Sequence, residues 1–327
     1  MFKALVLDQV DGKTTAEVKQ ISKDDLPEAD VLVAVEYTSL NYKDGMAVTG
    51  TGKIVRSFPM VPGVDFAGKV LESGSDRFKV GDPVILTGWG VGERHWGGYA
   101  QQARVKSDWL VGLPEGMDSR KAMIVGTAGL TAMLCVMTLE DAGVTPDKGP
   151  ILVTGAAGGV GSVSVSLLHT LGYEVAAATG RESTHEFLRG LGATQFVTRD
   201  EMNQPSRPLE AQRWAGGVDT VGGAILARMV AETNYDGAVA ACGLVADFKL
   251  NMTVMPFILR NVKLCGVDSV VCPIPRREEA WRRMAELLPE SAYADIGRVA
   301  SLEEVPDAAA RIMKGQVQGR VLIDPNK

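Results

Sequence analysis

Residues 151–168, ILVTGAAGGVGSVSVSLL, combine an apolar strand, a glycine-rich turn and the start of a helix with apolar spacing. Glycines let the backbone approach a diphosphate without a Cβ clash, and the helix N-terminus offers unpaired N–H groups and a partial positive charge. The turn is a variant of the G-x-G-x-x-G fingerprint, with Ala156 at the place of its first glycine. The order of strand, turn and helix predicts a dinucleotide-binding site that includes Ala157, Gly158, Gly159 and Val160.

The alternation of strands and helices continues after this motif. Six segments are interpreted as strands: ILVTG, EVAAAT, TQFVT, VDTV, GAVAACG and VKLCGVD. Helices are expected from about Gly161, Glu182, Leu209, Ala224 and Arg276. Such alternation is typical of a parallel sheet with helices on both faces. The sequence therefore predicts an α/β Rossmann domain with a six-stranded parallel sheet.

The end of the second predicted strand, EVAAATGRES, indicates the type of dinucleotide. A cofactor with a free ribose hydroxyl needs an Asp or Glu at this strand tip. Thr179, Gly180 and Arg181 stand there instead, and an arginine suits a 2′-phosphate. NADPH is therefore predicted rather than NADH. Arg199, just past the third strand, is a second candidate contact; the alternative for both arginines is a solvated surface charge.

The first 120 residues have a different pattern, with short alternating apolar runs separated by glycine and proline. This pattern predicts a β-rich, barrel-like unit. One of its strands ends in the polar residues Asn41, Tyr42, Lys43 and Asp44, where side chains could face a ligand.

Bulk composition narrows the class of protein. The chain has 327 residues, which indicates about two domains, and a net charge of -6, which argues against a nucleic-acid partner. The four scattered cysteines and the absence of a basic, apolar leader favour a reduced, cytoplasmic protein. Residues 122–139 carry no charge, but their glycines and threonines favour a buried helix between two domains over a membrane span.

The order of a barrel-like unit, a dinucleotide domain and a short C-terminal segment resembles the medium-chain dehydrogenase/reductase superfamily over essentially the whole chain. Long stretches such as SLNYKDGMAVTGTGKIVRSFPMVPGVDFAG and TVMPFILRNVKLCGVDSV are similar to the bacterial acryloyl-CoA reductases, which are also classed as quinone oxidoreductases. The resemblance implies a GroES-like β-barrel catalytic domain at 1–125, a Rossmann domain at 126–295 and a C-terminal return to the catalytic domain at 296–327. It also implies an active-site cleft between the two domains.

The implied reaction is the reduction of acryloyl-CoA to propanoyl-CoA by NADPH. Zinc-dependent relatives carry a cysteine at the position of Asn41 and Tyr42, and Gly-His-Glu at the position of Gly63, Val64 and Asp65. Residues 85–120 also lack the four cysteines of a structural zinc lobe. We therefore expect no zinc and a reaction that uses fixed hydrogen-bond donors.

The resemblance points to Tyr42 as the candidate catalytic and cofactor-contacting residue, with a structural role at the barrel rim as the alternative. Asn41 is expected to order its loop. Asp65 is expected to pair with Lys43 or with a backbone amide, and Lys43 and Asp44 could form a local ion pair. His95 either lines the substrate cleft or belongs to an ordered structural loop.

The fold and the resemblance together place Leu244, Ile258 and Ser269 near the nicotinamide. Coenzyme A carries phosphates, so a cationic anchor is expected. One option is Lys53 with Arg56. The other is a group on the last long helix, for which a solvated helix face is the alternative: Arg276, Arg277, Arg282 and Arg283.

Two other functions remain open at this stage. A quinone oxidoreductase would share the zinc-free site but would need no phosphate anchor. An NADPH-binding protein without turnover is the third alternative. The expected partner is a small-molecule thioester, with no nucleic acid and no membrane, and relatives without zinc suggest a homodimer formed through an edge strand such as VKLCGVD.

Overall fold

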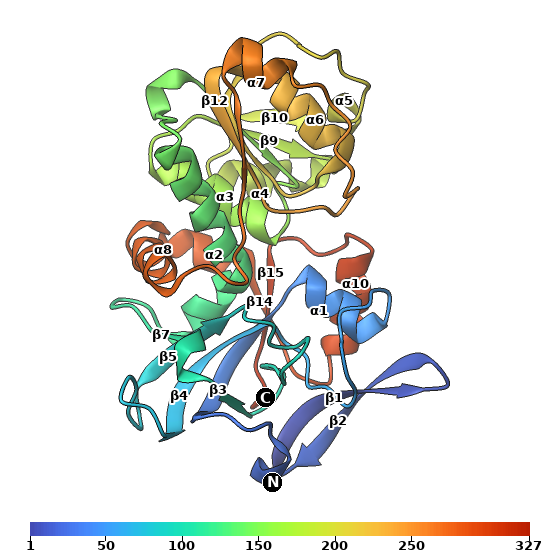
Figure 1. The fold of residues 1–327 in the computed structure, drawn as a ribbon, viewed down its shortest axis with the longest axis vertical. Helices are drawn as coiled ribbons and strands as arrows, with labels where there is room; N and C mark the ends of the chain where they lie inside the picture. Colours follow the sequence, from blue (N-terminus) through green and yellow to red (C-terminus); the bar gives the residue numbers. More distant parts are fainter. The chain divides into compact units, whose positions relative to one another are not determined.

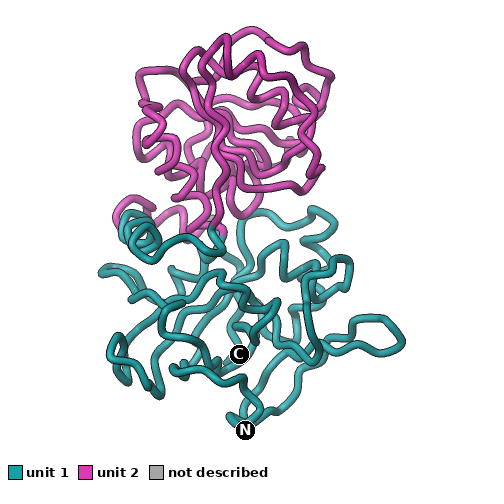
Figure 2. Tube along the Cα trace, in the orientation of Figure 1, with its two compact units in different colours: residues 1–127, 269–285, 296–327 teal, residues 128–268, 286–295 magenta. Residues whose placement is uncertain are grey.

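The computed structural model describes residues 1–327, apart from the side chain of Asp295. The chain forms two compact units (Figure 2). Unit 1 consists of Met1–Thr127, Ser269–Ala285 and Ile296–Lys327, and unit 2 consists of Ala128–Asp268 and Glu286–Asp295. The segment Ser269–Ala285 thus lies in unit 1, although the sequence pattern placed it with the nucleotide-binding domain.

Unit 1 is built mainly on antiparallel strands, with one parallel pair, β14 and β15 (Figure 1). Its larger sheet has the order β14-β15-β3-β4-β5-β7, with β6 also paired to β3, and the hairpin β1-β2 is separate. The strands are β1 (Phe2–Val10), β2 (Lys13–Ile21), β3 (Val31–Leu40), β4 (Asp65–Ser73), β5 (Pro83–Thr87), β6 (Gln102–Val105), β7 (Leu110–Gly112), β14 (Gly297–Ala300) and β15 (Arg320–Ile323). Because β15 pairs with β3, the C-terminal strands complete the sheet begun by the N-terminal segment.

Helices of unit 1 surround this sheet. They are α1 (Tyr42–Thr49), α8 (Ile274–Leu287), whose last residues belong to unit 2, and α10 (Val305–Met313). Helix α1 packs against α10, and the contact is close at Gly45, where a Cβ would lie 2.7 Å from Cγ2 of Ile312. A larger residue at position 45 would therefore separate the two helices.

Unit 2 contains the predicted six-stranded parallel sheet, with the order β10-β9-β8-β11-β12-β13. The strands are β8 (Ile151–Thr154), β9 (Val175–Thr179), β10 (Gln195–Thr198), β11 (Trp214–Asp219), β12 (Thr233–Ala241) and β13 (Lys263–Gly266). The helices are α3 (Gly159–Thr170), α4 (His185–Gly190), α5 (Arg199–Met202), α6 (Gly223–Glu232), α7 (Met255–Arg260) and α9 (Glu290–Ile296).

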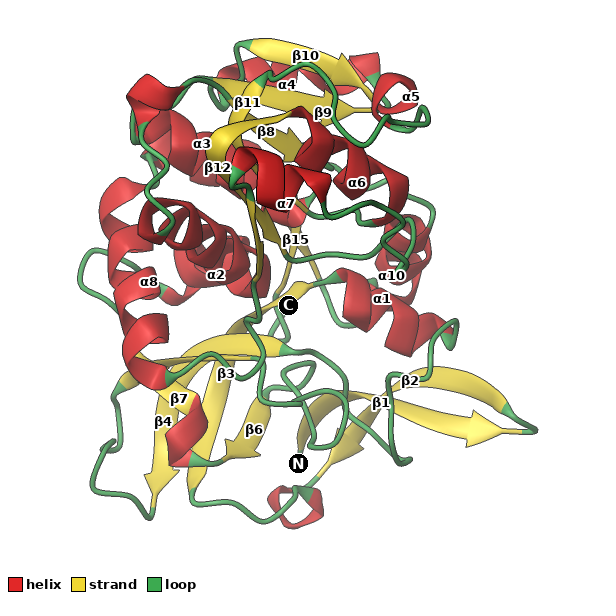
Figure 3. Ribbon diagram, turned by 45° about the horizontal axis from the view of Figure 1, so that its top comes forward, coloured by secondary structure: helices red, strands yellow, loops and turns green.

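The direction of the chain along this sheet reverses after β10. Strands β8, β9 and β10 progress one way, and β11, β12 and β13 progress the other way. Right-handed crossovers then place α3 and α4 on one face and α6 and α7 on the other (Figure 3). The α/β fold class predicted from the sequence is confirmed.

The helix expected from Leu209 is wrong. Residues 203–213 contain no helix, and the only helical turn in this connection is α5, which ends at Met202. Pro205 and Pro208 lack the backbone N–H that a helix interior needs. Arg207 instead donates its backbone N–H to Glu210 at 2.7 Å, and its guanidinium bonds to the same carboxylate. The segment is therefore held as a loop.

Helix α2 (Ser119–Asp141) includes the uncharged segment at 122–139. It is long and apolar enough to span a membrane, but 89% of its apolar window is buried inside the protein, as in the core helix of a globular domain. Gly126 interrupts it with a φ of 51° and a ψ of -149°, which a residue with a side chain rarely adopts. Unit 1 ends one residue later, at Thr127.

Short 3₁₀ helices complete the fold at Lys23–Asp25, Ser107–Trp109, Pro146–Lys148 and Glu182–Thr184.

Candidate active site

The carboxyl edge of the unit 2 sheet gathers most of the residues predicted to bind the cofactor. In an open parallel sheet, ligands bind outside this edge, where the strand order reverses. The glycine-rich turn follows β8, Thr179 ends β9, Arg199 follows β10, and Leu244 follows β12. The order of strands therefore places the phosphate turn between the arginine-bearing tips and the ends of β12 and β13.

The turn after β8 is shaped for close backbone approach. Gly155 has a φ of 57°, and a Cβ at Gly161 would clash with the carbonyl oxygen of Gly155. Gly158, Gly159 and Val160 are partly exposed at the start of α3. The N–H of Gly158 donates to the carbonyl oxygen of Gly155 at 2.8 Å, whereas the N–H groups of Gly159 and Val160 have no carbonyl in their own helix. Ala157 beside them is buried. The turn thus presents amides to an anion.

The tip of β9 lies against Arg199. A Cβ at Gly180 would lie 3.0 Å from Nε and 3.1 Å from Cζ of Arg199, so a side chain here would push this guanidinium away from its position against the tip. The hydroxyl oxygen of Thr179 accepts a hydrogen bond from the backbone N–H of Arg181 at 3.3 Å, so the tip of β9 turns around this hydroxyl. Arg199 and the 179–181 segment are therefore brought together, as a site for a 2′-phosphate requires.

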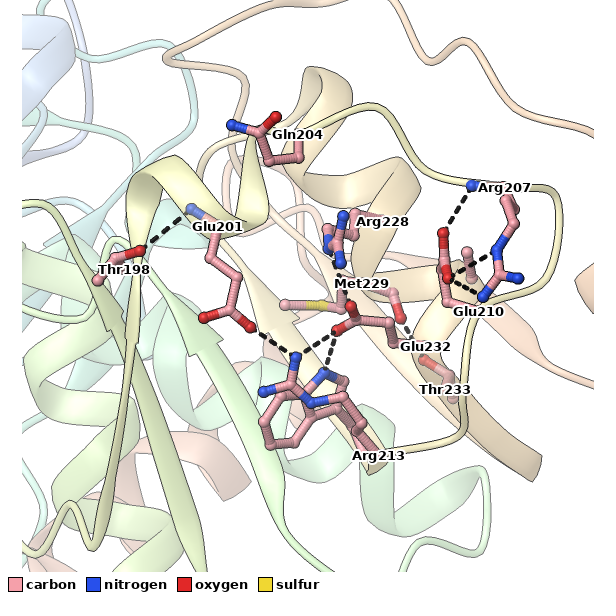
Figure 4. Close-up of polar contacts among 12 residues, drawn as sticks. Thr198, Glu201, Gln204, Arg207, Glu210, Arg213, Arg228, Met229, Glu232 and Thr233 are labelled. Atoms are coloured by element: carbon pink, nitrogen blue, oxygen red, sulfur yellow. Dashed lines mark hydrogen bonds and ion pairs between the residues drawn. The ribbon is translucent and has the colours of Figure 1, made fainter.

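A network of charged side chains holds the short helix α5 that carries Arg199 (Figure 4). The guanidinium of Arg213 donates to Glu201 of α5 at 2.7 Å and lies 3.6 Å from Glu232 of α6. Buried Glu232 also accepts from Nε1 of Trp214 at 2.9 Å and from Arg228 at 2.9 Å. Because α5 has only four residues, these bonds fix the position of its first residue.

The ends of β12 and β13 border a cavity of about 480 Å³. Leu244 and Cys242 belong to its wall, together with Gly266, Val267 and Asp268. Leu244 is 66% exposed, so its side chain is accessible to a ligand in this cavity. Ile258 is 73% exposed on α7 and is not part of this wall, and Ser269 is half-buried in unit 1. Of the three residues predicted near the nicotinamide, only Leu244 lines this cavity.

Tyr42 is the first residue of α1 and is 37% exposed. The preceding Asn41 caps the helix: its backbone N–H donates to Asp44 at 2.9 Å, and its side chain completes a reciprocal capping box. The capping box therefore fixes the backbone before and after Tyr42, from which the phenol projects.

Below Tyr42 lies a buried polar network centred on Asp65. This carboxylate accepts the N–H and hydroxyl of Ser39 at 2.9 and 2.8 Å, Nδ2 of Asn41 at 2.9 Å and the N–H of Thr127 at 2.8 Å. The last bond caps the part of α2 that begins after the Gly126 kink. Asp65 thus binds backbone amides, which is one of its two predicted roles.

Arg320 supplies the positive charge of this network. Its guanidinium donates to the hydroxyl of Ser39 at 2.6 Å and to Oδ1 of Asn41 at 3.2 Å, and also to the carbonyl groups of Leu40 and Ile124. Burial lowers the pKa of Arg320, and the neighbouring Asp65 and Asp44 oppose that shift. Sequence reasoning missed this residue; its only signal was a lone arginine in the apolar strand RVLI.

Asp44 is the second buried carboxyl group of the network. It accepts the N–H groups of Asn41 and Val64 at 2.9 and 3.0 Å. Burial, together with the charge of Asp65, raises its pKa from 3.8 to about 7. One guanidinium thus lies among two carboxyl groups, and Asp44 is the one that favours its neutral form.

Several sequence expectations about charged residues are wrong. Lys43 pairs with Glu93 at 2.7 Å and not with Asp44 or Asp65, because both aspartates point into the interior. Arg277 is buried and donates to Thr87 O at 2.8 Å and to Ser269 O at 3.0 Å, so it is neither a solvated charge nor an anchor for a ligand.

Other polar residues have structural partners. Arg282 pairs with Glu279 at 2.8 Å on α8. His95 bonds to the carbonyl oxygen of Arg104 at 2.7 Å and packs edge-on against Trp109, and burial lowers its pKa. These contacts fit the structural alternative for His95. Lys53 and Arg56 are exposed.

Comparison with known proteins agrees with this arrangement. The model of the alcohol dehydrogenase GroES-like domain matches residues 27–115, and that of the zinc-binding dehydrogenases matches residues 159–289. A probable acrylyl-CoA reductase of Escherichia coli K12 is 60% identical, over 99% of this chain and 100% of its own length. The chain belongs to the medium-chain dehydrogenase/reductase family, in its acryloyl-CoA reductase subgroup.

Two further relatives support this membership. The acrylyl-CoA reductase of Ruegeria pomeroyi is 56% identical over 100% of both chains. The crystal structure of an Escherichia coli K-12 medium-chain relative with bound NADPH is 60% identical, with a TM-score of 0.97 over 99% of this chain and 100% of that one.

Within this medium-chain family the residues at the metal positions differ from a zinc site. Asn41, Tyr42, Val64 and Asp65 offer one carboxylate but no thiolate or imidazole, and zinc prefers the latter two ligands. Among the described residues, no group of three or more His, Cys, Asp or Glu side chains could hold a metal. Asp65 is instead fully engaged by hydrogen-bond donors.

Proposed function

We propose that the protein reduces acryloyl-CoA to propanoyl-CoA with NADPH. The observation that carries the cofactor assignment is the tip of β9, where Gly180 stands in place of an acidic residue and Arg199 lies against it. The substrate assignment follows from full-length relatives of 56% and 60% identity whose names specify acrylyl-CoA.

Each part of the cofactor has residues suited to it. The amides of Gly159 and Val160 bind the diphosphate, and Ala157 and Gly158 shape the turn that presents them. Thr179, Gly180, Arg181 and Arg199 bind the 2′-phosphate. Leu244, Ile258 and Ser269 contact the nicotinamide half. When bound, NADPH would supply a hydride to the β-carbon of the thioester, and a proton from water at the α-carbon completes the reduction.

Tyr42 positions the reacting groups from the start of α1. Hydride addition puts negative charge on the thioester carbonyl, and a fixed donor stabilises such charge better than mobile water does. The phenol donates a hydrogen bond either to that oxygen or to the nicotinamide ribose. Its orientation depends on Asn41, whose side chain is held by Asp65 and Arg320.

Steady-state assays test this proposal. NADPH oxidation is measured with acryloyl-CoA, crotonyl-CoA and benzoquinone. We expect the highest kcat/KM with acryloyl-CoA, and a decrease of at least tenfold in Tyr42→Phe. Turnover of benzoquinone without turnover of the thioesters would support a quinone oxidoreductase, and binding of NADPH without any turnover would support a non-catalytic role. Inhibition by a chelator would contradict a reaction without metal.

We further propose a homodimer formed through β13. This strand is the edge of the sheet, and Leu259, on the helix α7 that leads into it, is exposed. Leu259→Glu should yield monomers in size-exclusion chromatography with light scattering. Val80→Glu is the matched control, because Val80 is also exposed but lies in unit 1. A dimer that persists in Leu259→Glu would contradict this interface.

A cytoplasmic location is part of the same proposal. The four cysteines are free thiols, two of them buried, which suits a reducing compartment.

A further inference from the structure

Unit 1 contains a second cavity, of about 180 Å³, formed by α10, β14 and the segment that leads into β15 (Figure 1). Its polar wall consists of Arg298, Arg311, Gln316, Gln318 and Arg320, and small apolar side chains complete it. The guanidinium of Arg320 is already engaged by Ser39 and Asn41 and by backbone carbonyl groups, so Arg298 and Arg311 are the cations that can serve a ligand. A guanidinium only donates hydrogen bonds, and no acidic side chain belongs to this wall, which indicates an anionic ligand.

The charges of Arg298 and Arg311 are not neutralised within the described part of the chain. Both side chains are exposed, and neither forms an ion pair or a side-chain hydrogen bond there. Glu304 interacts with Arg298: its pKa is lowered by the Ser301 N–H and by Lys327 and Arg298. Glu304 already accepts from Ser301 at 2.8 Å and lies 3.6 Å from Lys327. The cavity therefore has an excess of positive charge.

The size of the cavity limits what it can enclose. A water molecule occupies about 30 Å³ in the liquid, and pockets that enclose a drug-sized ligand measure about 300–1,000 Å³. A cavity of about 180 Å³ thus has room for one or two phosphate groups with water, but not for a whole nucleotide. Guanidinium groups bind phosphate with two parallel hydrogen bonds, so the charge and the volume agree.

Two elements that form the cavity also contact the residues around Tyr42. Arg320 in its wall donates to Oδ1 of Asn41, the residue that precedes Tyr42. Helix α10, which carries Arg311, packs against α1, which begins with Tyr42. A ligand held here by its phosphates would thus belong to the same unit as the candidate catalytic tyrosine.

We propose that this cavity binds phosphate of the coenzyme A part of the substrate, through Arg298 and Arg311. The inference rests on the proposed function, because it assumes a CoA thioester as substrate. Of the anchors considered from the sequence, Arg277 is buried and Arg282 is paired with Glu279, whereas Lys53 with Arg56 is the exposed alternative that the test compares.

The test combines a double variant, Arg298→Gln with Arg311→Gln, and two substrates. The KM for acryloyl-CoA should rise at least tenfold, whereas the KM for acryloyl-N-acetylcysteamine, which has no phosphate, should change less than twofold. Arg282→Gln is the matched control and should leave both values unchanged. The exposed positions should keep the thermal midpoint of unfolding near that of the wild type. An equal KM for acryloyl-CoA in variant and wild type would overturn the proposal, as would a tenfold rise in Lys53→Gln with Arg56→Gln instead.

Isothermal titration calorimetry measures the binding of CoA without any catalytic step. CoA itself, without the acryloyl group, is titrated into the NADP-loaded wild type and double variant, with pantetheine as the phosphate-free control. We expect CoA to bind the wild type at least tenfold more tightly than the variant. If the wild type binds CoA in this way but does not reduce acryloyl-CoA, the proposed reaction fails and the phosphate site stands. Equal affinity of both proteins for CoA refutes the site.

Discussion

Replacement of Asp44 by asparagine should change how the stability of the protein depends on pH. Asp44 is buried in a network that also contains Asp65 and Arg320, and a single guanidinium neutralises only one of the two carboxyl groups. Burial and the charge of Asp65 raise the pKa of Asp44 to about 7. The folded protein therefore keeps a proton on Asp44 at pH values at which the unfolded chain has lost it.

The sign and size of the effect follow from this shift. In the unfolded chain Asp44 loses its proton near its ordinary pKa of 3.8, and in the folded protein near 7. Between these values the folded state binds more protons, so the free energy of unfolding decreases as the pH rises, and it becomes constant above about pH 7. At about 1.4 kcal/mol for each pH unit the total is about 4 kcal/mol, of which roughly 2–3 kcal/mol falls between pH 5 and pH 8.

Denaturant-induced unfolding of the wild type and Asp44→Asn at pH 5, 6.5 and 8 measures this difference. Other titrating groups are common to both proteins and cancel in the comparison. The asparagine retains only one acceptor for the N–H groups of Asn41 and Val64, which adds a penalty that does not change with pH. The variant should therefore gain stability relative to the wild type by roughly 2–3 kcal/mol from pH 5 to pH 8.

Asp24→Asn, at an exposed site, is the control and should show no such change. A difference between the wild type and Asp44→Asn that stays constant over this range would refute the assignment of the proton to Asp44. A difference of opposite sign would mean that Asp44 is ionised and stabilised by Arg320.

Three further predictions concern other parts of the structure. Arg199→Ala should raise the KM for NADPH at least tenfold and the KM for NADH little, as initial rates with each cofactor can show; equal effects on both would exclude a 2′-phosphate contact. Arg213→Gln should also raise the KM for NADPH, but less strongly, because the substitution releases Glu201 of α5. Arg213→Lys should restore most of the affinity for NADPH. Gly126→Ala should lower the thermal midpoint of unfolding, because its φ is 51° and its Cβ would lie 2.9 Å from Asp65.

Local pattern was sufficient to predict the dinucleotide-binding sheet. Each of its strands is a short apolar run. The glycine-rich turn is one continuous segment of the sequence, and so is the tip of β9. The helix expected from Leu209 failed for a local reason, because two prolines within four residues were given too little weight.

The buried charges could not be predicted in this way. Arg320 bonds to residues 279 to 281 positions away, and Arg277 bonds to Thr87 across 190 positions. A run of alternating charges on a helix normally indicates a solvated face. Whether one member of such a run is buried depends on partners that only the folded chain brings near, and neither spacing nor composition encodes them.

The contact between Gly180 and Arg199 also restricts how cofactor preference can evolve. An acidic residue at position 180 is the ordinary single step toward NADH, but here its carboxylate would meet the guanidinium about 3 Å from its Cβ and would pair with it instead of with a ribose. The substitution would remove the phosphate site without creating a hydroxyl site. A lineage that changes cofactor must therefore lose Arg199 first, and the intermediate would bind both dinucleotides poorly.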